Sequence, residues 1–210
     1  MIKESQHNMY SNLPNIIIGF HGCDKSVKDK ILQEQMKFKP STNDYDWLGN
    51  GMYFWESNLK RAWEWAESGR TNPKISIQTP AVIGAVIDLG FCLDLVNSYH
   101  IQKLKEEYQI FEKEMNFIGR DFRKNKNIKG DDNYLLRYLD CAVIEHLHQD
   151  RELSGERPYD SVRGAFLEGD PIYETSGFRE QTHIQICIRN PNCIKGFFVP
   201  RLHDNSWQQP

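Results

Sequence analysis

The sequence lacks the short motifs that mark the commonest nucleotide-binding folds. It contains no Walker loop and no Gly-x-Gly-x-x-Gly fingerprint, so a P-loop or Rossmann nucleotide site has no support. It also contains no Cys-x-x-Cys pair, because Cys23, Cys92, Cys141, Cys187 and Cys193 are an odd, scattered set. Such a set predicts reduced thiols and a cytoplasmic protein.

Long apolar runs and an excess of positive charge are absent as well. No run approaches the roughly 20 residues of a membrane-spanning helix, and the first residues carry no apolar segment of a signal peptide. We therefore expect no membrane partner. The formal net charge of −3 gives no global attraction to nucleic acid. With 210 residues, 39% of them hydrophobic and 12% aromatic, the chain is long enough for one sizeable core.

Hydrophobic patterning predicts an α+β domain. Short apolar or alternating runs indicate strands, and apolar residues three or four positions apart indicate helices. Strands are expected at residues 16–20, 52–55, 81–90, 161–167, 182–188 and 193–199. One helix is expected between Ser26 and Lys37, and a second between an N-cap at Ser57 and Gly69. The turn-rich residues 39–51 between them predict a loop.

The middle of the chain changes character. An apolar stripe with helical spacing runs from Ile101 to Phe122, and a second one covers 135–147. These stripes predict a helical hairpin inserted at about residues 99–150. The expected organisation is a polar arm, a single domain and a tail, at residues 1–14, 15–200 and 201–210.

His21 and Gly22 follow the first apolar run and have two interpretations. On the first, His21 is a strand-end residue that only satisfies a loop carbonyl. On the second, its ring holds a ribose hydroxyl while the backbone of Gly22 pairs with a carboxamide. The second is chemically reasonable because a ligand can approach a backbone that carries no Cβ.

Tyr53 lies in the aromatic run Met-Tyr-Phe-Trp and also has two interpretations. Alternation along a strand places Tyr53 and Trp55 on one face and Met52 and Phe54 on the other. One face then belongs to the core, and the other is able to stack on a planar ligand ring.

Glu180 directly precedes the strand expected at 182–188. Taken alone, such a residue is most simply a solvated strand-end charge. If the strand is regular from residue 180, Glu180 shares a face with Ile184, whereas His183 and Gln185 share the polar face. A bulge at residue 181 would bring Glu180 to the polar face. His183 and Gln185 are therefore the second candidates for a catalytic group.

Two further patterns have both a structural and a functional interpretation. Arg163 and Glu168 either line a cleft or form a cross-strand ion pair. His146 and His148 suggest a metal site, but residues two positions apart on a helix do not share a face. We therefore expect no metal.

In this order the segments resemble the ADP-ribosyltransferase superfamily, specifically its His-Tyr-Glu branch, which includes diphtheria-toxin-like enzymes and poly(ADP-ribose) polymerases. The first motif is matched by Phe20-His21-Gly22, the second by the Gly-x-Gly-x-Tyr-Phe pattern of residues 49–54, and the third by Glu180 with the strand after it. Cys23 replaces the Thr or Ser that usually follows His-Gly. The chain is also similar, over residues 16–200, to a widespread group of uncharacterised bacterial proteins.

The resemblance implies a split, mainly antiparallel β-core and an enzyme that transfers ADP-ribose from NAD to a macromolecule, either protein or nucleic acid. It implies that Gly22 holds the carboxamide, His21 a ribose and Tyr53 the nicotinamide ring. Glu180 would stabilise the positive charge that develops on the ribose. Gly51 and Arg163 complete the expected NAD contacts. Because some relatives are toxins of toxin–antitoxin or phage-defence systems, an antitoxin is a further expected partner.

Other functions stay open for the same sequence. With water as the acceptor the protein would be an NAD glycohydrolase. An RNA 2′-phosphotransferase of the same fold would use Arg and His groups for phosphate. A catalytically inactive module that binds a nucleotide or a partner is the third alternative, and Cys23 is the feature that favours it.

Overall fold

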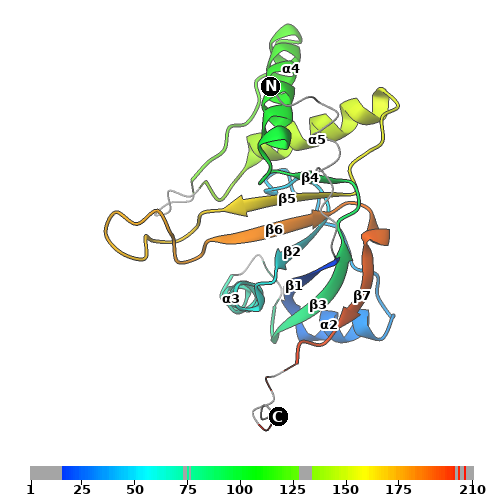
Figure 1. Ribbon diagram of the computed structural model, residues 1–210, viewed down its shortest axis with the longest axis vertical. Coiled ribbons are helices and arrows are strands. Elements are labelled where there is room, and N and C mark those ends of the chain that lie inside the picture. The colour runs from blue at the N-terminus through cyan, green and yellow to red at the C-terminus, as the bar shows by residue number, and fades with distance from the viewer. Residues whose placement is uncertain are drawn as a thin grey trace.

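The computed structural model describes residues 16–72, 75, 77–127, 134–201, 203 and 206. The arm expected at residues 1–14 and most of the tail expected at 201–210 lie outside the described residues. In the described part, a seven-stranded, mostly antiparallel sheet is combined with four α-helices (Figure 1), which confirms the α+β class.

The strands correspond to the predicted apolar runs, with one addition. They are β1 (Ile16–Asp24), β2 (Met52–Glu56), β3 (Pro80–Asp88), β4 (Cys92–Asp94), β5 (Ser161–Phe166), β6 (His183–Ile188) and β7 (Ile194–Phe198). Their order in the sheet is β4-β5-β6-β2-β1-β3-β7, and only β4 and β5 are parallel. Sequence patterning missed β4 because its three residues are too few to show an alternation.

The helices are α2 (Lys25–Leu32), α3 (Leu59–Gly69), α4 (Ser98–Phe117) and α5 (Tyr138–Leu153). Helix α3 begins one residue later than predicted, because the side chain of Asn58, not that of Ser57, accepts a hydrogen bond from the N–H of Arg61. None of the helices in the described ranges is long and apolar enough to cross a membrane.

The sheet consists of two halves that are joined weakly in the middle. Strands β1 and β3 pair along the whole length of β1, and β2 pairs with β6 from Met52 to Trp55. By contrast, β1 and β2 pair only at Gly19↔Glu56 and Phe20↔Trp55. Beyond these pairs the two strands separate. In Figure 1, β4, β5 and β6 run across the view while β3 and β7 run steeply along it.

The two halves enclose the main apolar core. Met52 and Phe54 of β2 and Ile186 of β6 pack in one cluster with Ala85 and Ile87 of β3. We call the side of the sheet that carries this cluster the inner face. Helix α2 closes one end of it, where Ile31 packs with Cys23 and Ile83.

The opposite side of the sheet, the outer face, is covered by two further groups of residues. Ala62 of α3 packs with Trp55 and Val82. Ile144 and Leu147 of α5 pack on the β4–β5–β6 half, together with Leu48 from the loop before β2. The predicted sharing of faces along β2 is confirmed, since Met52 and Phe54 belong to the inner cluster and Tyr53 and Trp55 to the outer ones.

Helices α4 and α5 are held together by His146. Its Nδ1 lies 2.5 Å from Oε1 of the buried Glu107, and its Nε2 lies 2.9 Å from Oε2 of Glu114. Burial alone would lower the pKa of His146, but the hydrogen bonds to Glu114 and Glu107 outweigh it and raise the pKa above its ordinary value. The charged imidazolium, which donates from both nitrogens, therefore fits this position.

This arrangement predicts a pH-dependent contribution to stability. Because the folded-state pKa of His146 is raised, its contribution is fully present below the unfolded value of about 6.5 and is lost as the pH rises through the folded value. We expect the difference in free energy of unfolding between wild type and His146→Gln to be largest in acid and to shrink above neutral pH. Urea unfolding across this range measures the difference.

The pH dependence of the wild type alone does not isolate His146, because other histidines change the free energy of unfolding with pH in the opposite direction. Burial lowers the pKa of His21 and of His148 to about 4, so both destabilise the fold as the pH falls. These contributions cancel in the difference. A difference that grows with rising pH would contradict a charged clamp at His146.

Candidate active site at the seam between β1 and β2

The pairing between β1 and β2 ends in the middle of the sheet, at a place that we call the seam. The N–H of Ser57 donates to the carbonyl of Ile18, so Ile18, and by alternation Phe20 and Gly22, direct their backbone groups towards β2. The ladder ends at Phe20↔Trp55. A continued ladder would pair Gly22 with Tyr53, and this pair is missing.

His21 fills the place of the missing pair. Its Nδ1 lies 2.8 Å from the carbonyl oxygen of Tyr53 and donates to it. The ring packs against Phe38 and Phe54, with centroid distances of 4.7 and 6.0 Å, and lies 6.3 Å from the ring of Trp65. His21 therefore does satisfy a backbone carbonyl, as its first interpretation expects, but this carbonyl belongs to strand β2 and not to a loop.

The protonation state of His21 follows from its surroundings. Burial lowers its pKa to about 4, although the hydrogen bond to Tyr53 opposes the shift. The ring is therefore neutral at pH 7, with its proton on Nδ1. Nε2 then carries a lone pair and is able to accept a hydrogen bond from a ligand hydroxyl.

Gly22 lies between this seam and helix α3. A Cβ at residue 22 would lie 2.2 Å from the carbonyl oxygen of Ala62 and 3.2 Å from the Cβ of Ala66. Close packing of α3 therefore requires glycine here. At the same time its N–H faces the seam, where the ladder supplies it with no partner. Both the structural and the ligand-binding interpretation of Gly22 are compatible with this position.

Tyr53 is positioned by the loop that precedes it. Its hydroxyl donates to the carbonyl of Gly49 at 2.6 Å and accepts from the N–H of Leu48 at 2.8 Å. Burial raises the pKa of Tyr53 far above its usual range. The hydroxyl is thus unsuited to proton transfer, and what remains for a ligand is the aromatic ring.

The same loop is tied to the inserted helix α5. Glu145 accepts from the N–H and the side-chain amide of Asn50 at 2.7 and 3.0 Å, and Arg189 donates to Glu145 at 2.5 Å. Sequence reasoning missed Glu145 and Arg189, since nothing in their local pattern links them to residue 50.

Gly51 has a structural role. Its N–H and carbonyl both pair with Ser41, at 3.0 and 2.7 Å. A Cβ would lie 2.5 Å from Sγ of Cys187 and 2.7 Å from the carbonyl oxygen of Ile188. The N–H and carbonyl of Gly51 are therefore both occupied by Ser41, and the NAD contact expected of Gly51 stays a prediction.

Strand β6 brings His183 and Gln185 to the outer face beside the seam. Gln185 lies opposite Trp55 of β2, and Cys187 lies opposite Tyr53. Since Cys187 packs in the outer cluster and Ile186 in the inner one, alternation places Gln185 and His183 on the same face as Tyr53. Gln185 is partly buried, and no described residue hydrogen-bonds to its side-chain amide.

Two buried polar atoms on this face also lack partners among the described residues. His183 donates from Nδ1 to the carbonyl of Gln181 at 2.7 Å, which leaves Nε2 as an unsatisfied acceptor. The indole N–H of Trp55 is an unsatisfied donor, and the two rings lie 6.3 Å apart. Buried unsatisfied groups are costly, so a donor and an acceptor on these two neighbouring rings are suited to a bound polar group.

Helix α3 adds an ion pair to the edge of this face. Arg61 donates to Glu168 at 2.9 Å, and Glu168 also lies 3.6 Å from Nδ1 of His183. Burial, together with the charge of Arg61, lowers the pKa of His183. The i, i+4 spacing of Arg61 and Trp65, which puts both on one side of α3, is the sequence signal that would have pointed to them.

Glu180 is not on this face. It lies in the connection between β5 and β6, which extends beyond the sheet in Figure 1. The residue is exposed, and its N–H donates to the carbonyl of Asp170. Strand β6 begins at His183, so no bulge carries Glu180 to the polar side. The structure brings Gln185 and His183, not Glu180, together with Tyr53.

Arg163 lies on the inner face, away from the outer-face residues. It pairs with Ile186, which belongs to the inner cluster. Its guanidinium donates to Glu56 at 2.5 and 3.1 Å and to Asp94 at 3.1 Å. Of the two interpretations of Arg163, the ion pair is therefore observed, with Glu56 and Asp94 as its partners in place of Glu168.

The cysteines are buried free thiols. Cys23 packs with Ile31 and Ile83 on the inner face, and burial raises its pKa to about 11. It is therefore a core residue without nucleophilic character at neutral pH. Within the described ranges, no group of three His, Cys, Asp or Glu residues is arranged to hold a metal ion.

Comparison with known proteins gives no functional assignment. No family model matches the chain, and no solved structure matches it. The chain is similar to the uncharacterised protein MJ0359 of Methanocaldococcus jannaschii, with 26% identity over 192 residues that cover 84% of this chain and 83% of the archaeal one.

Proposed function

We propose that the seam binds NAD and that the protein transfers its ADP-ribose part to a macromolecular acceptor, with release of nicotinamide. The observation that carries the proposal is the missing Gly22↔Tyr53 pair. It leaves the N–H of Gly22 without a ladder partner, at a position where a flat carboxamide would continue the ladder. At the same place the ring of His21, which packs against Phe54 of the inner cluster, donates to the carbonyl of Tyr53.

The proposed contacts follow the geometry of the seam. The Gly22 N–H donates to the carboxamide oxygen, and the ring of Tyr53 stacks on the nicotinamide. Nε2 of the neutral His21 accepts from a ribose hydroxyl. Gln185, whose amide has no hydrogen-bond partner among the described residues, takes the place of Glu180 in holding the ribose that reacts.

The proposed reaction is a substitution at the ribose carbon that bears nicotinamide. The C–N bond breaks and nicotinamide leaves with the electron pair. The acceptor atom bonds to the same carbon and loses its proton to solvent or to a neighbouring base. An amide dipole at Gln185 is able to stabilise the developing positive charge through its oxygen, but less strongly than a carboxylate would.

Because an amide stabilises positive charge less strongly than a carboxylate, a second candidate function is a module that binds NAD or a related nucleotide with little turnover. No carboxylate stands on the outer-face side of β6, where His183, Gln185 and Cys187 lie. Glu168, which is near His183, is already paired with Arg61. Binding without nicotinamide release would fit this arrangement.

The central test compares two variants. We expect Gln185→Ala to lower nicotinamide release from NAD by about 100-fold, because it removes a group that acts on the developing charge. Glu180→Gln, which removes the carboxylate of an exposed loop residue, should leave the rate unchanged. Free nicotinamide is measured by chromatography after incubation of the full chain with NAD and a cell lysate as the source of acceptor.

The outcomes separate the alternatives. Transfer of label from adenine-labelled NAD to macromolecules indicates an ADP-ribosyltransferase, and release without transfer indicates a glycohydrolase. Saturable NAD binding without release indicates the binding module. A loss of activity in Glu180→Gln alone would return the catalytic role to Glu180, and the absence of any NAD binding would refute the seam as an NAD site.

A further inference from the structure

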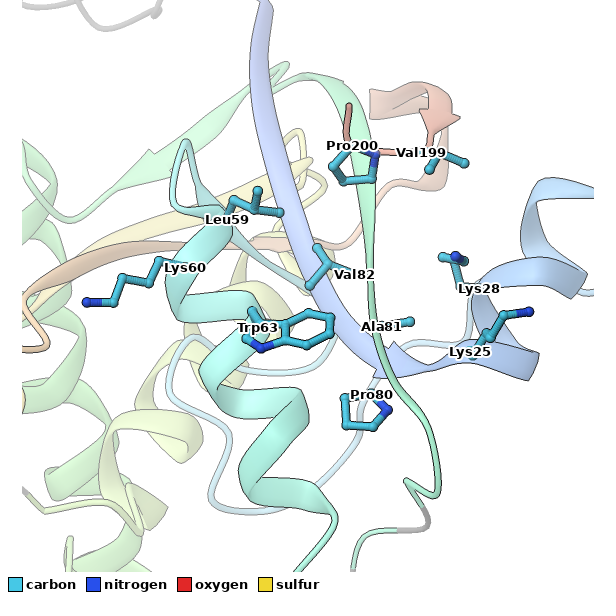
Figure 2. A pocket seen from close by; sticks show the side chains of 10 residues that line it. All are labelled: Lys25, Lys28, Leu59, Lys60, Trp63, Pro80, Ala81, Val82, Val199 and Pro200. Atoms are coloured by element: carbon cyan, nitrogen blue, oxygen red, sulfur yellow. The ribbon is translucent and has the colours of Figure 1, made fainter. Parts of the chain in front are cut away.

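A hollow lies at the edge of β3, on the side away from the seam. It has a volume of about 610 Å³ and lies between α2 and α3, and we call it the trough. Figure 2 shows β3 running through its middle. The residues that line it are Lys25, Lys28, Leu59, Lys60, Trp63, Pro80, Ala81, Val82, Val199 and Pro200.

The floor of the trough is a strand edge that no described residue pairs with. Strand β7 pairs with β3 only from Gly84 to Ile87, and the chain then leaves β3 at Val199 and Pro200. The N–H of Lys25 donates to Thr79, so by alternation the backbone groups of Val82 point away from β1 and into the trough. No described residue hydrogen-bonds to them.

The backbone groups of Val82 belong to a residue that is almost fully buried. Val82 is 7% exposed and Ala81 6% exposed, so the edge lies on the floor of the trough and not on the open surface. A backbone N–H and carbonyl buried without partners are unfavourable. A further strand laid along the edge would supply the missing hydrogen bonds, as in recognition by strand addition.

The two sides of the trough differ in chemistry. On the α3 side, Leu59 and Trp63 present apolar surface, 42% and 45% exposed. Lys25 and Lys28 stand on the α2 side, where both pair with Asp29, and Lys60 stands on the α3 rim, where it points away from β3 and lies 3.6 Å from Glu64. Among the described residues, none of those that line the trough is acidic, so a carboxylate of a ligand would share these lysines with Asp29 and Glu64. Successive side chains of an added strand point to opposite sides. An alternation of apolar and acidic residues therefore complements the trough.

A second copy of this chain is a poor occupant. Pairing two β3 edges would bring the three lysines of one copy against the three lysines of the other. Lysine and proline at an edge are known devices against such self-pairing. The positive rim thus selects against like chains and for an acidic segment of another protein.

We propose that the trough is a docking site for an extended acidic peptide segment of a partner protein, which adds to β3 as a strand. Its apolar side chains contact Trp63 and Leu59, and its carboxylates pair with Lys25, Lys28 and Lys60. This proposal is independent of the NAD chemistry proposed for the seam.

The test uses a fluorescein-labelled peptide of alternating Glu and Val residues and fluorescence anisotropy with the full chain. We expect saturable binding that weakens about tenfold in Trp63→Ala and roughly fivefold in Lys60→Glu. Lys105→Glu, the same charge change on an exposed position of α4, should leave the affinity unchanged. A peptide with an N-methylated backbone should bind much more weakly, because strand addition depends on its N–H groups.

Specific outcomes would overturn the proposal. Equal binding of a peptide with Lys in place of Glu would remove the acidic specificity. Displacement of the acidic peptide by an oligothymidylate would assign the trough to nucleic acid, whose bases would stack on Trp63. If the peptide shows no saturable binding to the wild-type chain, the trough is not a docking site, and the lysines and Pro80 only prevent strand pairing at this edge.

Discussion

Replacing Arg163 with methionine should lower the free energy of unfolding by about 3–5 kcal/mol, the usual cost of removing one partner of a buried ion pair. The side chains of Arg163, Glu56 and Asp94 are only 12%, 20% and 11% exposed. The change leaves two carboxylates on the inner face without their cation. Urea unfolding of the variant and the wild type measures the loss.

Two comparisons make this expectation specific. Arg70→Met, which removes an exposed pair with Glu67 at 3.6 Å, should cost at most about 1 kcal/mol. Adding Glu56→Gln to Arg163→Met should restore part of the loss, since it removes one of the unpaired charges. Normal stability combined with lost NAD turnover in Arg163→Met would contradict the ion-pair role and revive Arg163 as an NAD contact.

Replacing Gly22 with alanine should destabilise the protein by about 3 kcal/mol, the upper end of the usual cost of overpacking. The added Cβ would lie 2.2 Å from the carbonyl oxygen of Ala62, a backbone atom that moves only if α3 moves. Thermal or urea unfolding measures the change. Displacement of α3 would also shift Trp65, which lies beside His21, so nicotinamide release should fall as well.

Gly196→Ala is the matched control. Gly196 lies in strand β7, and no atom stands within 4 Å of the position where its Cβ would be. The same substitution should therefore change the free energy of unfolding by no more than about 0.5 kcal/mol. Equal stability of Gly22→Ala and Gly196→Ala would show that α3 does not pack on Gly22 as described.

Local patterning predicted most of the secondary structure because the local signals were strong. The β-branched run at 16–20, the aromatic run at 52–55 and the apolar run at 81–90 are all strands, and apolar residues at helical spacing marked α3 to α5. Two local features were predicted wrongly or missed. Asn58 replaced Ser57 as the cap of α3, and β4 was too short to detect.

Of the residues predicted for the candidate site, the structure brings some together and leaves one apart. His21, Gly22 and Tyr53 were selected by motif order, and the structure brings all three to one seam. Glu180 was also selected by motif order, but it lies in an exposed loop. Parity along β6 separates Glu180 from His183 and Gln185, and the strand is regular from His183 onward, so only the latter two share a face with Tyr53. The catalytic role of any of the three stays a prediction.

The sequence by itself determined what depends on neighbours along the chain: the strands, the helices, the faces shared along β2 and β6, and the His-Gly and Tyr segments. Only the tertiary structure decided which strands separate. It showed that β1 leaves β2 after Phe20, that Arg163 faces the inner core, and that no described residue pairs with the edge of β3 before Gly84. These features depend on which distant strands meet and on how far their pairing extends, whereas local periodicity only fixes which residues of one strand share a face.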